Sequence, residues 1–373
     1  MTNENIGPRK DVKESGLGRV SINPPVRRGR SQTRRVRDNP PYHRGLLCAL
    51  LCLFLAITSG LPAAEVPVAP SERATVVVVI GAAGEADFGE NFSNQAKLWE
   101  KVCEQAGAKR ITIGLEEPTT GGPTDLDRLN QALAAEPKDG GSEFWLVLIG
   151  HGTFDGRDAK FNLRGPDLAS SELAAWLKPF TRPMAVIDTS SGSAPFIAKL
   201  TGKNRVIVSA TRSGNELNYA RFGQYFSAAM LDPKSDLDQD GQTSLLEAFL
   251  SASANVLEFY KTEGRLSTEH ALIEDNGDGL GTPSDWFRGT RAIKKARDGG
   301  SLDGARAKQF HLIRSPAEQK MTAEQRARRD QIELEVEVLR EKKAKVPEDE
   351  YYHRLEGLML EMADVYGPAQ EGP

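Results

Sequence analysis

Apolar runs alternate with helical patterns from residue 73 onward, and this alternation limits the chain to few architectures. Residues 74–80 (ATVVVVI) are a continuous, mostly β-branched run that ends at Gly81, the pattern of a strand buried on both faces. At least four more short apolar runs follow, with amphipathic stretches between them. Repeated strand and helix units require right-handed crossovers. We therefore expect an α/β fold in which two helical layers cover a mostly parallel sheet, a three-layer α/β/α sandwich.

The first 72 residues divide into three segments by composition. Residues 1–45 form a basic arm that we expect to be disordered, with eleven Lys or Arg and four Asp or Glu in its first 44 residues. Residues 46–61 carry no charge, but the run is shorter than the roughly 20 residues of a spanning helix. The segment 46–64 therefore predicts an export signal peptide, with an uncleaved membrane anchor as the alternative. Residues 65–72 are a Pro-rich linker.

The net charge and the cysteine content limit the binding partners and the cellular compartment that we expect for this chain. An exported chain would be periplasmic or extracellular, with membrane contact only through residues 46–61 if the signal stays uncleaved. The net charge of −4 gives no reason to expect nucleic acid as a partner. Cys48 and Cys52 lie in the apolar run, so a cleaved chain keeps only Cys103 and forms no intramolecular disulfide. We expect Cys103 to be a buried structural thiol.

Two strand ends carry residues suited to catalysis. Residues 145–152 (WLVLIGHG) end in His-Gly, and residues 184–193 (MAVIDTSSGS) end in Ser-Gly-Ser. The carboxyl ends of parallel strands share one crevice, so His151 and a hydroxyl of Thr189 or Ser190 could act on one ligand as base and nucleophile. A hydroxyl needs a base in hydrogen-bond contact and usually a third group that orients the base. No such group stands at a fixed spacing from His151.

The order of these segments resembles the caspase-like fold, and most closely its legumain-like bacterial branch. The resemblance covers roughly residues 74–282: a strand ending in Gly81, a helix bearing Trp99, the His-Gly end, the small-residue end, and a strand leading into SATRSGNE. We accordingly expect a caspase-like domain over residues 73–290. The resemblance implies that His151, before Gly152, acts as acid and base beside a cysteine nucleophile, with backbone N–H groups stabilising the oxyanion.

The expected cysteine is absent from this chain. Thr189 stands at its position when the Ser-Gly-Ser motifs are aligned, and Ser190 stands there in the caspase form of the motif. Three functions remain open: a pseudoenzyme that binds a peptide or protein segment in the inherited cleft, an active hydrolase using one of these hydroxyls with His151, and an interaction scaffold that acts through the C-terminal helices. The resemblance also implies that residues 209–218 line a specificity pocket with Arg212, Glu216 and Asn218. A solvated loop with local ion pairs is the alternative.

Residues 236–247 (DLDQDGQTSLLE) fit the twelve-residue EF-hand loop. Carboxylates occupy positions one, three and five, Gly241 makes the sharp turn at six, and a glutamate closes the loop at twelve. This spacing wraps oxygen ligands around one Ca²⁺, the expected cofactor. The expected ligands are Asp236, Asp238, Asp240, the backbone carbonyl of Gln242, Ser244 through water, and Glu247 through both oxygens. An acidic turn that caps a helix without metal is the alternative.

A second acidic turn at residues 274–285 (EDNGDGLGTPSD) imitates the first, with Asn276, Asp278 and Gly279 in place. It has Glu at position one, Asp at position twelve and Pro283 within, so a Gly-rich turn is the simpler interpretation and a second calcium site the alternative. No cluster of histidines or cysteines has the spacing of a zinc site.

The C-terminal part of the chain has a different composition. Residues 291–315 are polar and Gly-rich, which predicts a linker, and residues 316–373 predict a helical extension. Its first helix, over 322–345, carries Ile332, Val336 and Leu339 on one face. Pro347 ends it, and a second helix over 349–365 is expected to bury Leu355, Leu358, Met359 and Met362. We expect this hairpin to dock on the core or on another subunit, with partner binding as the alternative.

Overall fold

The computed structural model describes residues 73–116 and 120–367. The basic arm 1–45, the predicted signal or anchor 46–64 and the linker 65–72 lie outside the described residues, as do Cys48 and Cys52. Within the described part of the chain, no helix is both long enough and apolar enough to cross a membrane.

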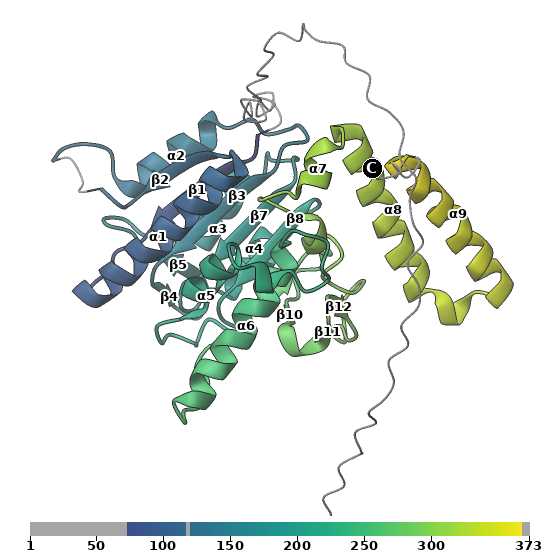
Figure 1. Cartoon of the computed structure of the whole chain (residues 1–373). Helices are drawn as coiled ribbons and strands as arrows, with labels where there is room; N and C mark the ends of the chain where they lie inside the picture. Colours follow the sequence, from purple (N-terminus) through teal and green to yellow (C-terminus); the bar gives the residue numbers. More distant parts are fainter. Residues whose placement is uncertain (1–72, 117–119, 368–373) are drawn as a thin grey trace, which may run out of the picture. The chain divides into compact units, whose positions relative to one another are not determined.

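A seven-stranded sheet forms the centre of the fold, in the order β10-β9-β8-β7-β3-β1-β2 (Figure 1). Its five parallel strands are β1 (Thr75–Ile80), β2 (Lys109–Ile113), β3 (Phe144–Ile149), β7 (Met184–Asp188) and β8 (Arg205–Ser209). The short strands β9 (Leu272–Glu274) and β10 (Thr282–Pro283) are antiparallel and extend one edge. Leu148 pairs with Asp188, and Asp188 with Ser209, so β3, β7 and β8 end at nearly the same level.

Helices cover both faces of the sheet, as the strand pattern predicts. Val76 and Val78 point into one core, and Val77 and Val79 into the other, because side chains alternate along a strand. The first core is closed by α1 (Ala86–Ala106), α5 (Phe222–Ala229) and α6 (Leu245–Thr262). The second is closed by α2 (Asp125–Ala135), α3 (Ser170–Leu177) and α4 (Pro195–Leu200). The predicted three-layer α/β/α sandwich is therefore confirmed.

A small antiparallel sheet follows β3 and lies over the strand ends. It consists of β4 (Gly152–Phe154), β5 (Ala159–Phe161) and β6 (Leu168–Ala169). A Cβ on Gly81 would lie 2.5 Å from the carbonyl oxygen of Asn162, and one on Gly150 would lie 2.9 Å from the Phe161 ring. Both positions need glycine because the small sheet passes so close to the ends of β1 and β3.

The segment expected as a linker is packed against the core. It contains β12 (Arg291–Ala292), which pairs with β11 (Phe287–Arg288), and the 3₁₀ turn η3 (Ala307–Gln309). Ala307, Phe310 and Leu312 are at most 4% exposed and belong to the same core as α6. The polar composition of the segment does not predict that it contributes to the core, because three spaced apolar residues produce no periodic pattern. Two further 3₁₀ turns are η1 (Pro233–Ser235) and η2 (Ser284–Trp286).

The C-terminal extension is the expected helical hairpin. It consists of α7 (Pro316–Lys320), α8 (Ala323–Glu341), the 3₁₀ turn η4 (Lys343–Lys345) and α9 (Glu348–Tyr366). Ile332, Val336 and Leu339 of α8 are buried, as predicted. The burial predicted for α9 is wrong: Leu355, Leu358 and Met362 are only partly buried, and Met359 is 43% exposed. Tyr351 is the buried residue among the described positions of this helix. The reason is that α9 packs chiefly against α8, so only one narrow face is covered.

Candidate functional site

Three segments from separate parts of the sequence meet at the carboxyl ends of β3, β7 and β8. The backbone N–H of Gly152 donates to Ser191 Oγ over 3.2 Å, and the N–H of Gly192 donates to the carbonyl of Glu216 over 2.8 Å. Gly214 lies so close to the Phe154 ring of β4 that a Cβ there would be 2.4 Å from it. The structure therefore brings together the His-Gly end, the Ser-Gly-Ser end and the loop 209–218.

Aromatic rings surround His151. Its ring centroid lies 4.7 Å from that of Phe88 and 5.2 Å from that of Phe92, both from the α1 region, and 6.1 Å from that of Tyr219. The Nε2 atom lies 3.2 Å from the carbonyl oxygen of Ala83. This contact directs a ring N–H toward a backbone acceptor. Asp155 and Asp158 bond elsewhere, to the backbone of their own turn and to the hydroxyls of Ser170 and Ser171 respectively.

The two candidate nucleophiles are both buried and both committed to other acceptors. Thr189 Oγ1 donates to the carbonyl of Leu148 over 2.8 Å, and its side chain is packed beside Gly223 at the start of α5. Ser190 Oγ donates to Asp188 Oδ1 over 2.6 Å and is fully buried. A hydroxyl has a single proton to donate. In this arrangement neither hydroxyl donates to the ring of His151.

Asp188 is a residue of the candidate site that the sequence did not predict. The last residue of β7, it is fully buried, and its Oδ2 has no hydrogen-bond partner among the described residues. Burial raises the pKa of its carboxyl to about 6, although hydrogen bonds from the Ser190 hydroxyl and N–H pull that pKa down. The apolar run of β7 gives no signal for this, because the sequence does not show whether the strand's final side chain points inward or toward solvent.

The side chain of Glu216 holds the loop 209–218 in position through polar contacts. Its carboxylate accepts from the backbone N–H and Nε of Arg212 at 2.9 and 3.2 Å, and lies 2.6 Å from Nδ1 of His270. The Glu216 side chain is mostly buried, whereas Arg212 and Asn218 are exposed. Among the three predicted pocket residues, Arg212 and Asn218 are therefore available to a ligand, while Glu216 has a positioning role. His270 was missed, because only the fold brings it beside a residue 54 positions earlier.

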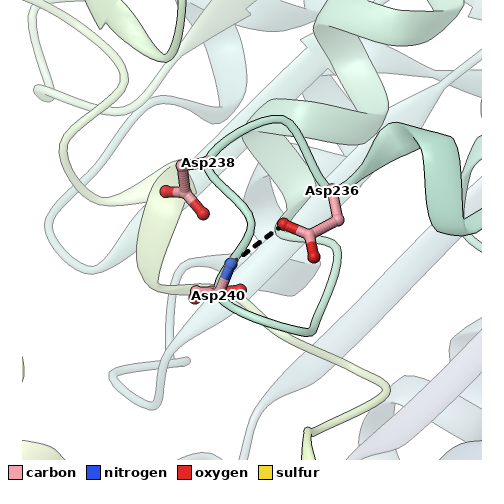
Figure 2. Close-up of side chains that lie close together, drawn as sticks. All are labelled: Asp236, Asp238 and Asp240. Carbon is pink, nitrogen blue, oxygen red and sulfur yellow. Dashed lines mark hydrogen bonds between the residues drawn. The ribbon is translucent and has the colours of Figure 1, made fainter. Parts of the chain in front are cut away.

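The EF-hand-like loop gathers three carboxylates. One oxygen from each of Asp236, Asp238 and Asp240 lies within 4.8 Å of the others, and Figure 2 shows these side chains around the turn. Asp236 accepts from the N–H groups of Asp240 and Gly241 at 3.1 and 3.0 Å (Figure 2 marks the first). Gly241 has φ +88°, which only glycine adopts readily.

The side chains of Glu247, Ser244 and Gln242 have other partners, although the ligand predicted for Gln242 is its backbone carbonyl. Glu247 is 1% exposed, and its two oxygens accept from the backbone of Leu237, Asp238 and Ser244 and from the Ser244 hydroxyl. Burial raises its pKa against these bonds. Ser244 caps the start of α6, and the side chain of Gln242 accepts from the N–H of Ser315. Lys308 Nζ lies 3.0 Å from Asp238 Oδ2, so a lysine charge already offsets one carboxylate.

In the second acidic turn, several side-chain oxygens accept hydrogen bonds from backbone groups, whereas the buried Oε2 of Glu274 has no hydrogen-bond partner among the described residues. Glu274 accepts from the N–H of Gly277, and Asp278 accepts from those of Leu280 and Gly300. The buried carboxyl of Asp275, the second residue of this turn, lies beside that of Asp303, and burial together with the Asp275 charge raises the pKa of Asp303 to about 8. Within residues 73–116 and 120–367, the group around Asp236 alone brings three such ligand atoms this close.

Comparison with known proteins concerns the fold. No protein-family model matches the chain, and no curated protein matches it. Among solved structures, the chain is similar to the Drosophila initiator caspase Dronc, with 12% identity and a TM-score of 0.37 over 56% of this chain and 82% of that one. It is also similar to caspase-1 from Spodoptera frugiperda, with 9% identity and a TM-score of 0.35 over 55% and 87%. Neither the family of this chain nor the roles of its individual residues follow from similarities at this level.

Proposed function

We propose that the chain is a catalytically silent, legumain-like relative of the peptidases, and that it binds an extended peptide or protein segment at the cleft formed by the two strand ends and the loop 209–218. One observation carries this proposal: Thr189 and Ser190 donate their hydroxyl protons to Leu148 and Asp188. A hydroxyl nucleophile has to give its proton to a base in hydrogen-bond contact. Binding has no such requirement.

The loop 209–218 offers groups that an extended segment can contact. Leu217 is 54% exposed, and the exposed Arg212 and Asn218 flank it with a cation and an amide. The bonds of Glu216 to Gly192 and His270 hold this loop against the second strand end. A loop that is already ordered loses little entropy when a ligand binds, which favours affinity.

A binding measurement with matched leucine variants tests this proposal. Leu217→Asp places a charge at the cleft, whereas Leu257→Asp makes the same change on α6, where Leu257 is 65% exposed. We expect the unmodified chain to retain a subset of an immobilised peptide library, Leu217→Asp to lose about tenfold in affinity, and Leu257→Asp to keep it. Equal loss in both variants, or no retained peptide, would overturn the proposed binding site.

Two other functions compete with this one. Hydrolysis by Thr189 or Ser190 with His151 would use the same cleft, and a peptidase assay separates it from simple binding. An interaction scaffold is favoured by the apolar residues that the hairpin leaves in contact with solvent, since Leu360 and Tyr366 are 62% and 60% exposed. If the scaffold function holds, Leu360→Glu abolishes partner capture without lowering the melting temperature of the core. Retained capture counts against it.

We further propose that the loop 236–247 binds Ca²⁺. Its support is the agreement between the EF-hand spacing and the convergence of Asp236, Asp238 and Asp240. The residues present fit the ion in part, because the three aspartates provide hard oxygen ligands. The fourth carboxylate, that of Glu247, accepts a hydrogen bond from the N–H of Asp238. Binding requires Lys308 to leave Asp238.

Export completes the proposed function. The segment 46–64 is proposed to direct the chain to the periplasm or the exterior, where calcium is abundant enough to fill a modest site. Membrane contact is proposed only through residues 46–61, if they are retained.

A further inference from the structure

A second cavity lies at the edge of the sheet opposite the proposed peptide cleft. It has a volume of about 620 Å³ and lies between the C-terminal ends of α3 and α4 and the start of β8. Arg205, which lines it, pairs with the first residue of β7, whereas Ser190 lies two residues beyond the last residue of that strand. Six residues separate Met184 from Ser190, which is roughly 20 Å of extended chain. The cavity is therefore independent of the cleft.

All charged residues that line this cavity are basic. Four of its residues are Lys178, Lys199, Lys203 and Arg205, and none is Asp or Glu. We call these four residues the basic pocket. The three lysines are exposed, and no salt bridge joins them to the described carboxylates within 4.0 Å. Lys199 interacts at longer range with Asp158, whose oxygens accept from Ser170 and Ser171.

Arg205 is the unusual member of the basic pocket, because it is a buried cation without a counter-ion. It is 8% exposed, and its guanidinium donates to the carbonyls of Leu200 and Leu177, at the ends of α4 and α3. The other buried arginines of the described chain face carboxylates: Arg182 lies 3.7 Å from Glu136, and Arg329 bonds Glu318 and Asp330. A buried charge without an opposite charge is costly.

We propose that the basic pocket binds a compact polyanion carrying two or more phosphate groups. Lysines act as point charges that suit phosphate, and helix-end carbonyls alone supply only partial negative charge to Arg205. The cavity has the size of ordinary small-molecule sites, roughly 300–1,000 Å³. A multiply charged anion fits four cations better than a single carboxylate does, because each added charge interacts with all of them. Such a ligand would neutralise Arg205 and bridge α3 to α4.

Calorimetric titration with inorganic triphosphate tests this proposal. The full chain is titrated with triphosphate, monophosphate and citrate at equal ionic strength, with chelator present so that calcium plays no part. We expect triphosphate to bind at least about tenfold more tightly than either of the others, and its affinity to fall as salt is added. Citrate binding as tightly as triphosphate would overturn the assignment to phosphate. So would the absence of any triphosphate heat.

A charge-matched pair of variants locates the site. The triple substitution Lys178→Ala, Lys199→Ala and Lys203→Ala removes three exposed charges from the basic pocket. The control removes three exposed lysines elsewhere, by Lys97→Ala, Lys101→Ala and Lys320→Ala. We expect the first variant to lose about tenfold or more in triphosphate affinity and the control less than about twofold. Equal losses would show that the binding follows net charge, which contradicts a site at the basic pocket.

Discussion

The hydrogen bonds of single side chains decide what chemistry the two strand ends can carry out. A thiol at position 189 or 190 would be partly ionised and nucleophilic without help, but a hydroxyl is neither. The sequence alone shows that hydroxyls stand where the cysteine is expected. It does not show that Ser190 donates to Asp188 or Thr189 to Leu148, because those bonds depend on the conformation of the strand end. Glu216 and His270, 54 residues apart, are equally invisible before folding.

The buried carboxyl of Asp188 should make stability depend on pH. Its folded pKa is about 6, above the roughly 3.9 of an unfolded aspartate. A carboxyl with a raised pKa binds its proton more tightly in the folded state, so ionisation destabilises the fold. Wild-type stability should therefore fall, relative to Asp188→Asn, as pH rises from about 4 through about 6, by at most about 3 kcal/mol.

Urea denaturation of both proteins across this pH range checks the expectation. Taking the difference between the two removes the contribution of Asp275 and Asp303, whose pKa values are also raised. A difference in unfolding free energy that stays constant from pH 4 to 8 would contradict the buried, titrating Asp188.

At the scale of elements, the sequence predicted strands and helices well where its apolar pattern is regular, and poorly where the pattern is irregular. The continuous apolar runs identified β1, β3, β7 and β8, because a strand buried on both faces has a distinctive composition. The EF-hand spacing correctly placed three carboxylates around one turn. The same spacing gave no indication that Lys308 lies beside Asp238. Lys308 comes from a segment 70 residues further along the chain, and that segment has no periodic pattern of its own.

Calcium should stabilise the chain through this loop. We expect a melting temperature that rises with Ca²⁺ concentration, because a ligand that binds only the folded state stabilises it by mass action. Asp236→Asn should abolish the rise, whereas Asp298→Asn, at an exposed position outside the loop, should retain it. Lys308→Met removes the competing ammonium group and should increase Ca²⁺ affinity. A rise of equal size in Asp236→Asn would place the ion elsewhere.

At the scale of the whole molecule, the C-terminal segments belong to the fold. Phe310 and Leu312 contribute to the core beneath α6, and the buried Arg329 of α8 bonds Glu318 of α7. The sequence predicted the hairpin from its helical pattern, but it gave no indication of how residues 291–315 tie it to the sheet. The central claim still concerns the two strand ends: His151, Thr189 and Ser190 lie at the same end of the sheet, yet both hydroxyls donate to other acceptors.

Turnover of a fluorogenic peptide library by the purified chain, with calcium present, tests that claim most directly. Wild-type and His151→Ala proteins are compared at equal concentration, after circular dichroism has shown that both are folded. We predict the same background rate for both, because neither Thr189 nor Ser190 donates its proton to His151. Cleavage by the wild-type protein that disappears in His151→Ala would contradict the account and establish an active hydrolase.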